Sequence, residues 1–116
     1  MSLNVTVCRI NAETGEEEDL DFSRPIGAEN RRFDFYGSPA VKSLGLKLIA
    51  QLEKEGIDIG YDDLEEFEKE IKIMQENLTF IMKDCNRDEE DCASRLRLIL
   101  RAIEYAKLNQ AHVQLG

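Results

Sequence analysis

The sequence predicts an α+β domain in which an N-terminal β-hairpin packs on three α-helices. Two observations predict this fold class. Apolar and polar residues alternate near the N-terminus, and apolar residues recur with helical spacing along three later stretches. The 116 residues suffice for one ordinary domain with its own core. We therefore expect a single domain over residues 1–116.

Residues 4–36 are expected to form the hairpin and a loop that follows it. The stretch NVTVCRI alternates like a strand, NAETGEEE supplies a turn with a glycine, and DLDF alternates again. In the loop, Phe33 and Phe35 flank Asp34 with a period of two. This spacing allows a short third strand.

Residues 38–55 are expected to form the first helix. Ser38 is a favourable N-cap, and Pro39 takes the first helical position, where its missing N–H costs nothing. Gly56 ends the helix. Its apolar side is marked by Val41, Leu44, Leu48 and Leu52.

Two longer helices are expected over residues 62–85 and 88–110, joined by a short loop as an antiparallel helical hairpin. Their apolar residues recur at alternating spacings of three and four, and Asn86 or Asp88 can cap the last helix. Residues 110–116 are expected to fray.

Several apolar side chains lie off the facing sides of these two helices. They are Ile73, Phe80, Leu98, Leu100 and Leu108. One partner helix cannot cover all of them, so the first helix, the sheet or a second subunit must do so. A homodimer is therefore one expectation.

The chain is acidic, with a formal net charge of −9, and its acids are concentrated. One cluster lies at the hairpin turn (EEEDLD), and another begins the helix expected over residues 62–85 (DDLEEFEKE). Nucleic acids and anionic lipids are bound by Lys and Arg, so we expect neither a nucleic acid nor a membrane as partner.

The second acidic cluster is a candidate surface for a basic protein partner. Its candidate residues are Asp62, Asp63, Glu65, Glu66 and Glu70. The alternative is a solvated helix start, because carboxylates at a helix N-terminus interact favourably with the helix dipole.

A second candidate site combines arginines with aromatic residues and would bind a small anion. Its residues are Arg24, Arg31, Arg32 and Tyr36, with Phe33 and Phe35 beside them. Guanidinium groups bind carboxylates and phosphates through paired N–H donors. The alternative is that these arginines pair with the molecule's own acids.

No catalytic constellation is found, and we lean towards a role that is not enzymatic. His112, the single histidine, lies near the C-terminus and is expected to be exposed. Cys8, Cys85 and Cys92 lack the spacing of a metal or redox motif, and a disulfide between the last two is a minor alternative. We expect no cofactor and no metal.

A calcium loop at residues 52–63 is also disfavoured. Aligned with an EF-hand loop, the stretch offers Leu52, Lys54 and Gly56 where side-chain oxygen ligands are needed. The start of the chain lacks a basic segment followed by an apolar one, so the cytoplasm is the expected location.

The sequence thus favours a small acidic protein-interaction module, for example an inhibitor or immunity-type partner of a basic protein. The alternative is a regulatory domain that binds a small anion through the arginine and aromatic patch.

Overall fold

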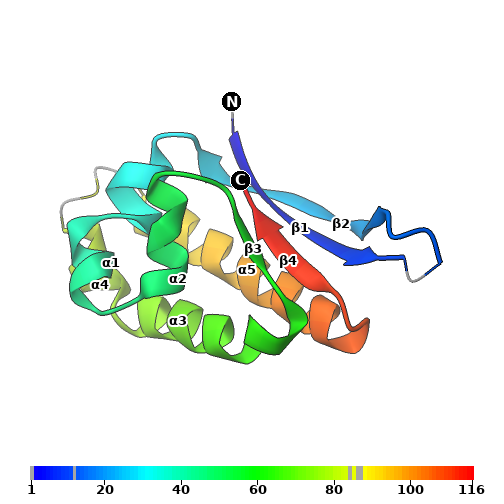
Figure 1. Ribbon diagram of the computed structural model, residues 1–116. Coiled ribbons are helices and arrows are strands. Elements are labelled where there is room, and N and C mark those ends of the chain that lie inside the picture. The colour runs from blue at the N-terminus through cyan, green and yellow to red at the C-terminus, as the bar shows by residue number, and fades with distance from the viewer. Residues whose placement is uncertain (1, 12, 84, 86–87) are drawn as a thin grey trace.

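The computed structural model describes residues 2–11, 13–83, 85 and 88–116. It contains a four-stranded antiparallel sheet with the strand order β2-β1-β4-β3. The strands are β1 (Ser2–Ile10), β2 (Glu17–Ala28), β3 (Ile57–Ile59) and β4 (His112–Leu115). The helices gather on one face of this sheet, and no described segment crosses the other face (Figure 1). The predicted α+β class, with an N-terminal hairpin and a long C-terminal helix, is confirmed.

The hairpin of β1 and β2 forms as the alternation predicts. Leu3, Val5 and Val7 of β1 are fully buried, because every second side chain of a strand points to the same face. The pairing with β2 shifts register twice, after Leu3 and after Thr6. The hairpin projects beyond the helices at one end of the molecule (Figure 1).

The C-terminal segment lies in the middle of the sheet, so the expectation that it frays is wrong. Strand β4 pairs with β1 on one side and with β3 on the other. Val113 and Leu115 are buried among the core residues. The short third strand expected at residues 33–35 is also wrong, because Arg32–Tyr36 forms a π-helical turn.

The expected helix over residues 38–55 is broken into shorter pieces. They are α1 (Pro39–Ser43), α2 (Lys47–Ala50) and the 3-10 turn Gln51–Glu53. Gly45, with φ of +79°, adopts the left-handed conformation between α1 and α2, which ends the first helical segment. The predicted N-cap is confirmed, because the Ser38 hydroxyl accepts a hydrogen bond from the Val41 N–H at 3.3 Å.

The expected helix over residues 62–85 is also interrupted. The 3-10 turn Tyr61–Asp63 leads into α3 (Leu64–Glu76), which ends at Asn77 before α4 (Leu78–Met82). The Asn77 side chain donates a hydrogen bond to the Ile73 carbonyl at 2.8 Å, a local bond of the kind that favours helix ends.

The last helix, α5 (Glu89–Leu108), matches its prediction closely. Of its two predicted caps, Asp88 accepts a hydrogen bond from the Glu90 N–H at 3.0 Å, and Asn86 lies outside the described residues. Helices α3 and α5 run antiparallel, and α5 packs on β1, β2 and β4 (Figure 1).

The apolar side chains off the facing sides are partly covered within one chain. Ile73 and Leu100 pack against the core, whereas Phe80 and Leu108 remain exposed. Self-association through α4 and α5 therefore stays a prediction, and fewer exposed apolar side chains support it.

Candidate interaction surface on the open face of the sheet

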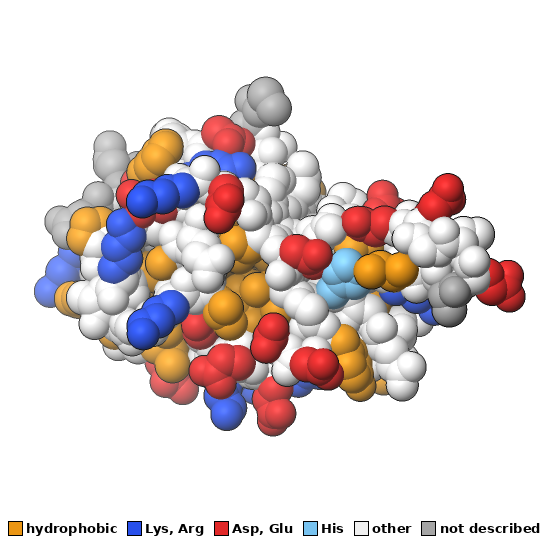
Figure 2. All heavy atoms as spheres, viewed as in Figure 1, with side chains coloured by type: hydrophobic (Ala, Val, Ile, Leu, Met, Phe, Trp, Pro, Cys, Tyr) orange, Lys and Arg blue, Asp and Glu red, His pale blue; other side chains and the backbone are white. Residues whose placement is uncertain are grey.

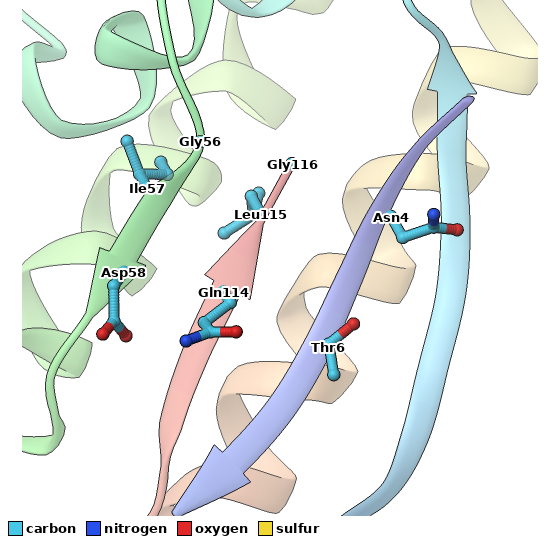
Figure 3. Close-up of a pocket in the computed structure, with 8 residues that line it drawn as sticks. All are labelled: Asn4, Thr6, Gly56, Ile57, Asp58, Gln114, Leu115 and Gly116. Atoms are coloured by element: carbon cyan, nitrogen blue, oxygen red, sulfur yellow. The ribbon is translucent and has the colours of Figure 1, made fainter. Parts of the chain in front are cut away.

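The uncovered side of the sheet, which we call the open face, brings together polar side chains from all four strands. Strand register places Ser23, Thr6, Gln114 and Asp58 in one row across the sheet. The Thr6 and Ser23 hydroxyl oxygens lie 3.1 Å apart. Figure 3 shows Thr6, Gln114 and Asp58 side by side on β1, β4 and β3. Cys8 and His112 form the neighbouring row of the same face.

Two hollows mark the open face. One, of about 400 Å³, lies over β1, β4 and β3 and is lined by Asn4, Thr6, Asp58 and Gln114 among others (Figure 3). A second, of about 390 Å³, lies at the end of the sheet next to His112. Ile10 and Tyr61 line the second hollow and are 63% and 48% exposed. Two large apolar side chains therefore border a hollow beside a polar sheet face.

His112 is held on this face by Asp58. The His112 Nδ1 atom lies 2.6 Å from Asp58 Oδ1, and the ring is mostly buried between the neighbouring strands. The expectation of an exposed histidine is therefore wrong, because the segment that carries it is a central strand. The period-two pattern of AHVQLG, with Val113 and Leu115 alternating with polar residues, was the signal for this strand.

Cys8 completes a cysteine, histidine and aspartate cluster that lacks the geometry of a nucleophilic site. The Cys8 Sγ atom lies 4.0 Å from His112 Nδ1 and 3.9 Å from Nε2, so it aligns with neither ring nitrogen. Burial, together with Glu17, Asp58 and Asp19, raises the pKa of the Cys8 thiol to about 12. A fully buried thiol that stays protonated at neutral pH is a poor nucleophile.

The raised pKa of Cys8 predicts a loss of stability in alkali. In the unfolded chain the thiol ionises near its ordinary pKa of 9.0, whereas in the folded protein it stays protonated up to about 12. Between these values the unfolded state binds fewer protons, so the stabilisation present below pH 9.0 falls as pH rises towards 12. We expect Cys8→Ala to lose less unfolding free energy than wild type between pH 8 and pH 11 in urea titrations. Parallel losses in the two proteins would refute this assignment.

Acidic side chains surround the open face and form what we call the acidic rim. The rim consists of Glu17, Asp19, Asp58, Asp62 and Asp63, all of them exposed. Glu17, Asp19 and Asp58 lie close enough to Cys8 to raise its pKa. Figure 2 shows acidic side chains on the projecting hairpin and along the edge below His112. Members of both acidic clusters, Glu17 and Asp19 of one and Asp62 and Asp63 next to Tyr61 of the other, therefore lie near this end of the sheet.

The predicted acidic surface at the start of α3 divides into exposed and buried members. Asp62, Asp63, Glu65 and Glu66 are exposed, as a partner surface requires. Glu70 is only 7% exposed, so its assignment to an accessible surface is wrong. Its carboxylate accepts hydrogen bonds from the backbone N–H groups at the start of α2, Leu48 at 3.2 Å and Ile49 at 3.0 Å.

The four residues of the predicted anion site do not converge on one place. Arg24 stacks on Phe22, with its guanidinium carbon 5.3 Å from the ring centre. Arg32 pairs with Glu29 at 2.5 Å and donates to the Leu52 carbonyl at 2.8 Å.

The remaining two members of that predicted site are buried. The Tyr36 hydroxyl donates to the Ile26 carbonyl at 2.7 Å, and burial raises the pKa of Tyr36. Arg31 is 5% exposed and pairs with Asp34 at 2.8 Å. Their inclusion in an exposed patch is therefore wrong, and the arginines use the molecule's own acceptors.

Metal ligation, membrane spanning and similarity to known proteins can each point to a function. Over the residues that the structure describes, no group of His, Cys, Asp and Glu is placed to hold a metal ion. No described helix is both long enough and apolar enough to cross a membrane. Comparisons with protein-family models, curated proteins and solved structures found no match to this chain.

Proposed function

We propose that the chain is a protein-interaction module that binds a basic protein through the open face of its sheet. The observation that carries the proposal is the position of Ile10 and Tyr61. Both are large, exposed side chains beside one hollow, next to a sheet face that no described element covers. Exposed aromatic and aliphatic side chains at a hollow are typical anchors of protein interfaces.

The acidic rim determines the chemistry of the partner. Glu17, Asp19, Asp58, Asp62 and Asp63 surround the anchors, and the whole chain carries a formal net charge of −9. A partner with Lys and Arg around an apolar side chain complements this surface, and opposite charges speed its encounter. Nucleic acids and anionic membranes are repelled by the same charges.

A matched pair of double variants tests the proposal by capture from a native lysate. Ile10→Ser with Tyr61→Ser removes the anchors, whereas Phe33→Ser with Phe80→Ser removes apolar residues of similar exposure elsewhere, 58% and 45%. We expect wild type and the Phe33/Phe80 variant to capture the same basic protein. The Ile10/Tyr61 variant should lose it by tenfold or more, as is typical of anchor residues.

The charge dependence gives a second measurement on the same capture. Asp62→Asn with Asp63→Asn should weaken binding and flatten its dependence on salt, because exposed charges act through a screened field. If both double apolar variants capture the same proteins in the same amounts, the open face is not the binding surface and the proposal fails.

Three more specific proposals are an inhibitor or immunity-type role, a cytoplasmic location and a homodimer. A partner identified by this capture decides the first of these. Sedimentation of the chain at micromolar concentration decides the homodimer, for which Phe80 and Leu108 are the exposed apolar residues on α4 and α5.

A further inference from the structure

A separate hollow lies where the far ends of β1 and β2 meet the first turns of α5. It has a volume of about 430 Å³, and its lining includes Gly27, Asn30, Arg31, Asp91 and Arg95. None of these residues belongs to the open face. Two arginines therefore line one hollow of a chain that is otherwise strongly acidic.

Arg31 is held in the wall of this hollow by one ion pair and by hydrogen bonds to neighbouring side chains. Its Nη2 atom pairs with Asp34 at 2.8 Å and donates to Asn30 Oδ1 at 3.1 Å, and its Nη1 donates to Cys85 Sγ at 3.4 Å. Gly27 makes room for the arginine, because a Cβ atom there would lie 2.6 Å from Arg31 Cγ. Arg31 thus has a fixed position in the wall.

Arg95 has a donor that is not satisfied. Its Nη1 donates to the Pro25 carbonyl at 2.8 Å, and its Nη2 lies 3.4 Å from Asp91 Oδ1. The Nε atom is buried and has no hydrogen-bond acceptor among the described residues. Buried donors of charged groups are normally paired, so an acceptor brought by a ligand would satisfy this one. Reaching it requires the Arg95 side chain to turn, because neighbouring atoms cover Nε in this structure.

We propose that this hollow binds a small oxyanion, a carboxylate or phosphate group, at Arg95, with Arg31 fixed in the wall of the same hollow. Guanidinium groups bind both kinds of oxyanion through paired N–H donors. Asp91 competes with the ligand for Arg95, because its carboxylate already pairs with the guanidinium group. It is half-exposed, so it can turn to solvent when an anion takes its place beside Arg95. The ligand must be compact, because the surrounding chain repels long polyanions.

The test is an NMR titration of the whole chain with inorganic phosphate and, separately, with acetate, at constant ionic strength. We expect saturable shifts of the Arg95 Nε–H signal with a Kd below about 10 mM for at least one of the two anions. The anion that binds identifies the class of ligand. Absence of saturation with both anions overturns the proposal.

Charge-matched variants separate this site from general attraction of anions. Asp91→Asn should tighten binding by about two- to fivefold, because the ligand no longer displaces an exposed ion pair. Glu90→Gln removes the same charge from the neighbouring position and should leave the Kd unchanged. Equal tightening by both variants would mean general attraction and would overturn the site.

Arginine variants on one helix provide the second control. Arg95→Gln should weaken binding at least tenfold, whereas Arg97→Gln, which lies outside the hollow, should have no effect. The readout for these variants is the shift of the Gly27 and Asn30 amides. Equal affinities in the two variants would contradict the proposal, whatever the outcome for the open face.

Discussion

Replacing Val113 by Asp should prevent the protein from folding. Val113 is fully buried in β4, with β1 on one side and β3 on the other. A carboxylate at this position has no partner and would cost at least about 4 kcal/mol. A domain of this size has a stability of about 5–15 kcal/mol, so the loss removes most or all of it. Circular dichroism and urea titration of the purified variant measure the effect.

The neighbouring residue supplies the control for Val113. Gln114 points to the open face, and Gln114→Ser should change the unfolding free energy by less than about 1 kcal/mol. If Val113→Asp instead folds with nearly wild-type stability, the segment lies outside the core and the fold of the sheet is wrong.

Replacing Glu70 by Ala should cost about 2–4 kcal/mol of unfolding free energy. The Glu70 carboxylate accepts from both Leu48 N–H and Ile49 N–H at the start of α2. Leu46, the residue that precedes α2, makes no side-chain hydrogen bond that caps this helix. The carboxylate from α3 therefore does the work of an N-cap through tertiary contact, and its loss leaves buried donors without a partner.

The control is the same substitution one turn earlier on α3. Glu66 is exposed, and Glu66→Ala should change stability by no more than about 0.5 kcal/mol. Urea unfolding curves of the two variants give the comparison. Equal and small effects would mean that Glu70 is a solvated surface residue, as its sequence context suggests.

Local signals in the sequence were sufficient for the fold class and for several boundaries. The alternation of β1 predicted its buried side, and the caps Ser38 and Asp88 both bond as expected. These features depend on neighbours in the chain, so a single sequence contains the information.

The end of α5 shows why the last strand was missed. Gln110 takes the left-handed conformation, with φ of +51°, and the Ala111 N–H bonds to the Ala106 carbonyl at 2.9 Å. Glycine is the usual residue at this position, and its absence hid the helix end. The helical pattern therefore predicts a helix that continues to residue 110, and the alternation after it is too short to predict a strand.

The candidate site depends on tertiary contacts that spacing along the chain cannot reveal. Asp58 and His112 are 54 residues apart and meet only because β3 and β4 are neighbours. The acids at the start of α3 were identified from composition, but the burial of Glu70 depends on α2 packing against α3. In the same way, the sequence predicts Arg31 in an exposed patch, whereas the structure places it in the interior.

The central claim is that the open face binds the partner, and mapping that contact by NMR tests it most directly. With the captured basic protein added to the labelled chain, shifts should concentrate at Thr6, Ile10, Tyr61, His112 and Gln114. Signals of α4 and of the outer side of α5 should stay in place. Shifts confined to α4 and α5, with the open face unchanged, would contradict the account.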